Sequence, residues 1–293
     1  MSIRLGANPI IWSNDDMREL GADTTLETCL LQAREIGFEG MELGHKFPRD
    51  PAELTSVLGR FGLACVSGWY SAQLLARDAA AEFDSLRAHL DLLKALGSST
   101  LVFAETSGAI HGDLQRPLAE RPQLSTDQWR EFGQRMTEVA KRTQDEGVRL
   151  AYHHHMGTVV QSEADIDALM DATGDEVALL LDTGHAAFAG ADPASLAERY
   201  SSRIAHLHAK DLRAAVRERA LAENWSFLRA VVEGVFTVPG DGSVAFGEVF
   251  AELPFYSGWI VLEAEQDPRK ADPVRYATLG YRTLKQLMAE HMQ

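Results

Sequence analysis

Short apolar runs alternate with longer segments of mixed polarity along the whole chain of 293 residues. The apolar runs have the length of buried strands and are bounded by polar or glycine-containing stretches. The longer segments repeat apolar residues at helical spacing, and those before Gly37, Gly97 and Gly147 end at the glycine. We therefore predict strands at residues 3–8, 40–44, 63–69, 100–105, 149–154, 177–182, 204–210 and 259–265.

The order of these segments predicts an α/β protein in which strands and helices alternate. Helices are predicted at residues 25–38, 80–97, 125–147, 193–200 and 272–292. Eight strands in a chain of this length fit a single (β/α)8 TIM barrel, which we expect to form one domain over residues 1–293. An open doubly wound sheet is the competing fold, but the segment after the first strand has no GxGxxG pattern.

Two connections are longer than usual, at about 106–125 and 211–246, and each follows a predicted strand. In a barrel, the loops after the strands cover the catalytic face, so we expect both segments to lie over the active site.

Composition narrows the class of partner. The formal net charge is −15 and no basic stretch stands out, so we expect no nucleic-acid ligand and a small polar substrate instead. Cys29 and Cys65 are too few for a disulfide framework and are expected in the core. With no signal peptide and no membrane-length apolar run evident, we expect a cytoplasmic protein without membrane contact that could form a homo-oligomer.

Polar side chains recur where the predicted strands end, and this is where barrel enzymes place their active sites. A single such residue would be ordinary, but the fifth to the eighth strands all end in histidines or carboxylates. The candidate site residues are Asn8, Glu42, Trp69, Glu105, His153, His154, His155, Asp182, His185, His206, His208, Lys210, Glu263 and Glu265.

Side chains alternate between the two faces of a strand, which divides the run of three histidines. His153 and His155 are expected at the barrel mouth and His154 on the opposite face, where it could satisfy a backbone group. The same alternation groups His206 with His208 and Lys210, and Glu263 with Glu265.

Imidazoles and carboxylates that converge from four strands suit a divalent ion such as manganese, cobalt, iron or zinc more than calcium. Two other interpretations stay open. Asp182 could cap a helix, although the next helix is expected to start near Asp192–Pro193. Glu265 could be a surface residue paired with Arg269.

Several segments, in order along the chain, resemble the xylose isomerase-like superfamily of metal-dependent sugar isomerases and epimerases. They are "LLLDTGH", "HLHAKD", "VPGDGSVAFGEVF" and "GWIVLEAEQDP". The segments "ANPIIWSND", "FAETSGAIHG", "AYHHHMGT" and "EAEQDP" are similar, more narrowly, to the inosose dehydratases of myo-inositol catabolism.

The resemblance implies a metal held by Asp182, His208 and Glu263, with His185 in contact with the substrate. At the end of the fifth strand, epimerases of the superfamily carry a glutamate where this chain has His153. The fourth ligand could therefore be His153, His155 or Glu105. The resemblance also implies manganese or cobalt, with zinc, iron or magnesium possible, and glutathione as an accessory.

Replacement of one glutamate by histidine favours elimination over epimerisation, because elimination needs an acid and a base with different tasks. The resulting hypothesis is dehydration of a polyol-derived ketone, 2-keto-myo-inositol (scyllo-inosose), to trihydroxycyclohexane-1,2-dione and water. The candidate bases are Glu105, His185 and Glu263, the candidate acids are His155 and His185, and Lys210 could stabilise an enolate oxygen. Substrate contacts are predicted for Asn8, Glu42, Trp69, His206 and Glu265, with Trp12 as a further apolar wall.

The main alternative is a keto-sugar isomerase or epimerase that uses the same metal. An apurinic endonuclease of the superfamily is disfavoured by the net charge of −15. A barrel without catalysis is disfavoured because Asp182, His208 and Glu263 are all present.

Overall fold

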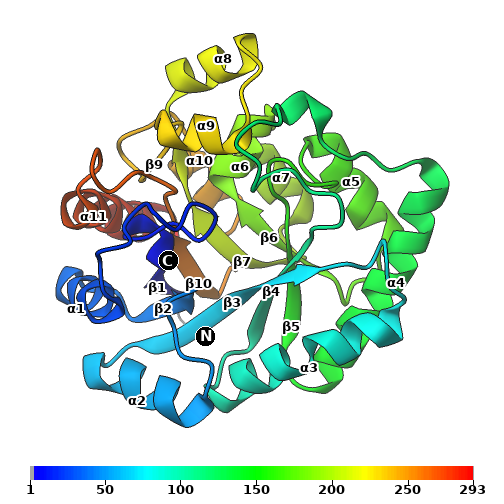
Figure 1. The fold of residues 1–293 in the computed structure, drawn as a ribbon, viewed down its shortest axis with the longest axis horizontal. Coiled ribbons are helices and arrows are strands. Elements are labelled where there is room, and N and C mark those ends of the chain that lie inside the picture. Colours follow the sequence, from blue (N-terminus) through cyan, green and yellow to red (C-terminus); the bar gives the residue numbers. More distant parts are fainter. Residues whose placement is uncertain (1–2, 293) are drawn as a thin grey trace.

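The predicted strands form a closed parallel barrel in the computed structural model, which describes residues 3–292 (Figure 1). The strand order around the barrel is β1-β10-β7-β6-β5-β4-β3-β2. The bounds are β1 Ile3–Ala7, β2 Gly40–Leu43, β3 Ala64–Ala72, β4 Thr100–Glu105, β5 Arg149–His153, β6 Ala178–Asp182, β7 Ile204–Ala209 and β10 Gly258–Leu262. The (β/α)8 prediction is therefore confirmed, with most strand ends within one or two residues of their expected positions.

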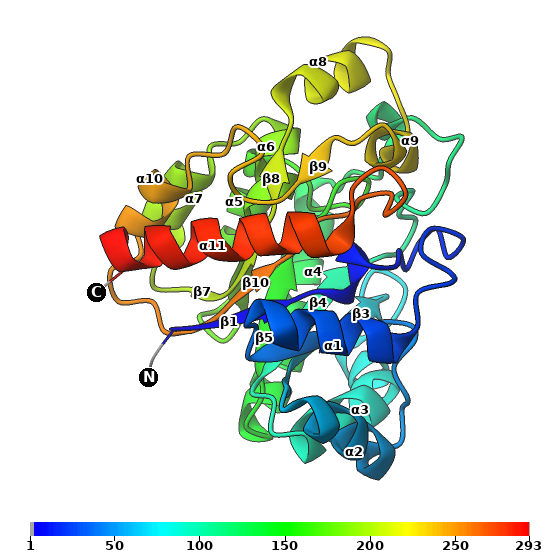
Figure 2. The same ribbon diagram turned by 90° about the vertical axis from the view of Figure 1, so that its left-hand side faces the viewer.

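Helices surround the barrel, and α11 lies beside α1 so that the last helix closes the ring (Figure 2). The larger helices are α1 Leu26–Ile36, α2 Pro51–Phe61, α3 Ala79–Ala95, α4 Thr126–Asp145, α5 Glu163–Ala172, α7 Pro193–Tyr200 and α11 Pro273–His291. Shorter ones are α6 Thr183–Ala189, α8 Ala214–Ala222, α9 Phe227–Val232 and α10 Phe246–Ala251. No helix within residues 3–292 is long and apolar enough to cross a membrane.

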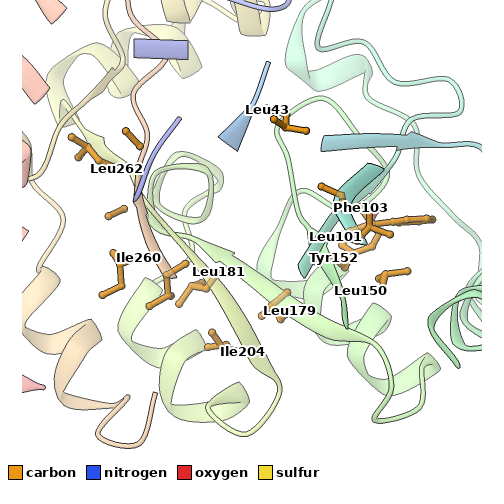
Figure 3. Packing of buried hydrophobic residues seen from close by; sticks show 14 of the residues in the cluster. Leu43, Leu101, Phe103, Leu150, Tyr152, Leu179, Leu181, Ile204, Ile260 and Leu262 are labelled. Carbon is orange, nitrogen blue, oxygen red and sulfur yellow. The ribbon is translucent and has the colours of Figure 1, made fainter. Parts of the chain in front are cut away.

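The main core lies between the barrel and the helices, and its side chains come from alternate strand positions. Phe103 and Tyr152 belong to this outer layer (Figure 3), whereas Val102 and Ala151 face the barrel interior together with Leu180. Because adjacent residues of a strand point to opposite faces, the outward position of Tyr152 leaves His153 pointing inward.

The two long connections contact each other. The segment 211–246 holds the two-stranded sheet β8 Asp211–Leu212 and β9 Phe236–Thr237 as well as α8 and α9. Leu118, in the connection after β4, donates its backbone N–H to Trp225 O over 3.0 Å. Both residues belong to a second apolar cluster, which also contains Phe227 and Phe236.

Candidate active site and metal centre

A cavity of about 250 Å³ opens at the carboxyl ends of the barrel strands. Its walls combine acceptor and donor groups with a few apolar surfaces, as is typical of sites for small polar ligands. The lining residues are Asn8, Ile10, Asp15, Asp16, Glu42, Leu43, Trp69, Ser71, Val102, His111, His153, His155, His208, Glu263 and Glu265.

Four residues predicted as metal ligands converge at the floor of this cavity. His153 Nε2 and His208 Nδ1 each lie 3.5 Å from Asp182 Oδ2. His208 Nδ1 also lies 2.7 Å from Glu263 Oε2. Ligand atoms bound tetrahedrally at about 2.1 Å from an ion are about 3.4 Å apart, so the two separations of 3.5 Å suit one shared ion. The 2.7 Å separation has the length of a hydrogen bond and would widen around an ion.

The floor also contains polar atoms that the protein itself does not satisfy. Asp182 Oδ2 and His208 Nδ1 are buried and have no hydrogen-bond partner. Attraction to the Glu263 and Glu42 carboxylates outweighs burial and raises the pKa of His208 well above its ordinary value. A bound cation would take the place of the proton on this ring and would also satisfy Asp182 Oδ2. Burial lowers the pKa of His153 to about 4, so that ring is neutral near pH 7 and its free nitrogen can bind metal. The residues present therefore fit a divalent metal.

Asp182 performs two tasks with its two oxygens. Oδ1 accepts the backbone N–H of His185 over 2.8 Å and caps α6, while Oδ2 faces the ligand cluster. The sequence-based expectation that the next helix starts near Asp192 was wrong, because the short α6 begins directly after β6 and α7 follows it. The capping and metal-binding interpretations of Asp182 are therefore compatible.

Lys210 places a buried positive charge behind the ligands. Its Nζ lies 2.7 Å from Glu263 Oε1, 3.4 Å from Asp182 Oδ2 and 2.9 Å from His185 Nε2. Attraction to Asp182 and Glu263 outweighs the cost of burial and raises the lysine pKa above its ordinary value. Lys210 is thus a fixed ammonium group beneath the cavity floor, on the far side of the ligands.

Comparison with known proteins places this architecture in a family. Residues 30–287 match the xylose isomerase-like TIM barrel family. The chain belongs to this family. It is 46% identical over 291 residues to the rhizopine catabolism protein MocC of Rhizobium meliloti, covering 99% of this chain and 90% of that protein. It is 41% identical over 280 residues to inosose dehydratase 2 of Bacillus cereus, covering 94% of each.

Among solved structures, the IolI protein with a bound zinc atom aligns with a TM-score of 0.71 at 14% identity, covering 99% of both chains. The probable 3-DHS dehydratase AsbF of Bacillus anthracis aligns with a TM-score of 0.70 at 15% identity, covering 96% of this chain and 98% of its own. At these identities, both alignments support the xylose isomerase-like fold alone.

His155 and Glu265 lie next to each other on the cavity wall, with His155 Nε2 3.7 Å from Glu265 Oε1. Burial, partly opposed by Lys210, raises the pKa of Glu265 to about 7. Burial, reinforced by Lys210, lowers the pKa of His155 to about 4. Arg269 binds Asp267 over 2.8 Å, so the alternative of a surface Glu265–Arg269 pair is wrong.

Glu105 lies away from this cluster. Its carboxylate accepts the backbone N–H groups of Leu74 over 2.6 Å and Ser107 over 2.8 Å, and it does not line the cavity. The reason is alternation, because Glu105 follows Phe103 onto the outer face of β4 while Val102 faces inward. Glu105 was predicted both as a base and as an alternative fourth ligand. The structure places it neither in the cavity nor among the other predicted ligands.

The remaining predicted residues divide between the cavity and the packing around it. Trp69 lines the cavity, with its ring centroid 5.2 Å from that of His153. Trp12 is buried in the main core and donates from Nε1 to Gln32 over 2.7 Å, so it does not form the apolar wall that the sequence suggested. His154 Nε2 accepts the backbone N–H of Asp182 over 3.3 Å, as expected for a residue that satisfies the backbone.

The ionisable lining residues Asp15, Asp16 and His111 were missed by sequence reasoning because they lie in connections and not at strand ends. The His111 ring centroid is 5.1 Å from that of His155, and its Nδ1 is buried without a partner. Gly157 allows this approach, since a Cβ there would lie 2.9 Å from the His111 backbone nitrogen and its φ is +79°. The "GAIHG" segment in the long connection was the available signal.

Proposed function

We propose that this protein is a metal-dependent hydro-lyase of inositol catabolism that converts 2-keto-myo-inositol to trihydroxycyclohexane-1,2-dione and water. The observation that carries the proposal is 40–41% identity to inosose dehydratases over 94% of this chain. A buried cluster that could hold a metal, next to an acid–base pair, supports it. A cavity of about 250 Å³ is suited to one small polyol ring.

His153, Asp182, His208 and Glu263 would hold the ion. When bound, a divalent metal supplies Lewis-acid stabilisation of negative charge on the ketone oxygen. Manganese or cobalt is our preferred ion, and zinc fits the same mixed nitrogen and oxygen donors.

The proton transfers are assigned to residues that line the cavity. His155 Nδ1 donates to Met156 O over 2.8 Å, so in the neutral ring Nε2 carries the lone pair and is the base that removes the proton next to the ketone. Glu265, with its pKa raised to about 7, supplies a proton to the departing β-hydroxyl, which leaves as water, and the resulting enol tautomerises to the dione. This assignment gives His155 the role of base, whereas the sequence suggested an acid.

Lys210 and His185 support the site from behind. Neither side chain lines the cavity, but Lys210 Nζ binds both His185 Nε2 and Glu263 Oε1. Trp69 offers an apolar face to the C–H side of the substrate ring, and the His111 ring packs edge-on against that of His155 on the cavity wall.

The decisive experiment incubates metal-loaded protein with scyllo-inosose and follows the absorbance of the conjugated dione. We expect dione formation that stops when a chelator is added and that falls by about 10²–10⁴-fold in His155→Ala. The matched control is Lys141→Met, which changes a surface ion pair with Glu176. Deuterium incorporation from solvent without loss of water would instead identify an isomerase or epimerase.

The 46% identity to MocC favours a second candidate, a step of rhizopine catabolism carried out at the same site. It is tested in the same assay by comparing turnover of scyllo-inosose with turnover of rhizopine breakdown products. A higher kcat/KM for the latter would favour this candidate.

A further inference from the structure

Glu42, on β2, is a buried carboxylate surrounded by hydrogen-bond donors. Asn8 Nδ2 donates to Oε2 over 2.8 Å, and the Ser67 hydroxyl donates to Oε1. His206 and His208 direct their Nε2 atoms at Oε1, at 2.9 and 3.2 Å. Because an ionised carboxylate can only accept, all four neighbours donate to it, and its four or so lone-pair positions are used.

This saturation argues against two other roles for Glu42. One possible metal-ligand atom from each of Glu42, His206 and His208 lies within 4.8 Å of the other two, a spacing that a cation could bridge. Both imidazole nitrogens that face the carboxylate carry hydrogen, however, so neither has a lone pair for an ion. Nor has Glu42 an acceptor position left for a substrate hydroxyl.

The hydrogen bond to Glu42 selects the tautomer of His208. With Nε2–H donated to the carboxylate, the lone pair of the neutral ring lies on Nδ1. Nδ1 is 2.7 Å from Glu263 Oε2 and 3.5 Å from Asp182 Oδ2, and it makes no hydrogen bond. Glu42 therefore directs the lone pair of His208 Nδ1 toward the carboxylates of Glu263 and Asp182.

Asn8 connects Glu42 to a second ligand. Its Nδ2 donates to Glu42 Oε2 over 2.8 Å and to Glu263 Oε2 over 3.0 Å. Its Oδ1 accepts the backbone N–H of Ile10 over 2.9 Å, and this contact fixes which end of the amide faces the cavity. The position of Glu263 is thus tied to that of Glu42.

We infer that Glu42 and Asn8 are positioning residues of the metal centre that orient His208 and Glu263, although the sequence suggested that they bind substrate. The inference rests on the metal dependence of the proposed function. Groups that orient metal ligands typically change metal affinity by about 10–100-fold when they are removed.

The test titrates metal-free Glu42→Gln with Co²⁺ alone and reads the visible absorption of the bound ion, with a competing chelator to obtain Kd. The amide keeps the size of the side chain but presents an N–H group to neighbours that are themselves donors. We expect Kd to rise by about 10–100-fold with an altered absorption band, and KM for scyllo-inosose to be unchanged at saturating Co²⁺. The control is Glu39→Gln, an exposed residue that pairs with Arg4 over 3.3 Å, for which no change is expected.

Asn8→Ala provides a second test in case Glu42→Gln does not fold, since it removes the bridge and leaves the Glu42–histidine contacts in place. It is also expected to weaken Co²⁺ binding. Wild-type Co²⁺ affinity in the folded variants would overturn the inference, as would a raised KM without a change in Kd. Co²⁺ binding is measured without substrate, so failure of the wild type to form the dione would refute the proposed reaction and leave this test valid.

Discussion

Replacement of Lys210 by methionine tests how strongly charge holds the cavity floor together. The Lys210 side chain is fully buried, with Nζ 2.7 Å from Glu263 Oε1 and 3.4 Å from Asp182 Oδ2. At an effective dielectric constant of about 20, these distances correspond to gross attractions of about 6 and about 5 kcal/mol. Desolvation of the charges offsets part of this, and loss of one partner from a buried ion pair costs about 3–5 kcal/mol.

We therefore expect the free energy of unfolding of the metal-free Lys210→Met variant to be about 3–5 kcal/mol below that of the wild type. For a chain of this size, the thermal midpoint would fall by about 6–10 °C. In the variant, an added divalent ion replaces the missing positive charge and has no ammonium group to compete with. Metal should therefore raise the free energy of unfolding of the variant by more than that of the wild type.

The assay is thermal unfolding monitored by circular dichroism, with and without Co²⁺, at one fixed scan rate. Lys141→Met is the control, because its partner Glu176 lies 3.7 Å away at the surface and such pairs contribute at most about 1 kcal/mol. If the free energy of unfolding of metal-free Lys210→Met lay within about 1 kcal/mol of the wild-type value, this reasoning would be refuted. An equal gain from Co²⁺ in both proteins would refute it too.

Two further substitutions and one labelling experiment test other parts of the structure. Asp182→Asn keeps a side chain that can cap α6 but removes a negative charge beside the buried Lys210, so calorimetric metal binding should be lost and the thermal midpoint should fall; wild-type metal affinity would refute the ligand assignment. Gly157→Ala, at φ +79° and 2.9 Å from the His111 nitrogen, should cost about 1–3 kcal/mol in urea unfolding and raise KM; unchanged values of both would contradict the close approach. Burial raises the pKa of Cys29 and Cys65 to about 12, so at pH 8 a thiol reagent should label them slowly until urea is added, and prompt labelling of folded protein would argue against burial.

The barrel could be predicted because its strands are short, apolar and well separated by helical segments. The prediction of the helices was less complete. α6 is only seven residues long, contains Gly184 and is almost entirely buried, so it has no amphipathic pattern to detect. α2 was missed although Asp50 caps it, Pro51 opens it and Gly62 ends it, which are ordinary start and stop signals.

The site was predictable where its residues occupy inward-facing positions at the ends of strands, as His153 and His208 do. Alternation applied to β4 would also have placed Glu105 outward with Phe103. The positions of His111 and Asp16 depend on how connections fold over the barrel, and no strand or helix period governs those segments. The two tasks of Asp182 require knowledge of where α6 begins.

That helix start sets a rule for the spacing of the Asp–Thr–Gly–His segment. Asp182 is the N-cap of α6 and His185 is the residue whose N–H it accepts, so His185 lies within the first turn and faces Lys210. Each helical residue rotates the direction of its side chain by about 100°. One residue inserted between the aspartate and the histidine would swing the imidazole away from Lys210, and one deleted would swing it the other way. The number of residues between the two is therefore fixed by helix geometry, and Gly184 among them leaves room for Lys210, because a Cβ there would lie 2.5 Å from the lysine Cγ.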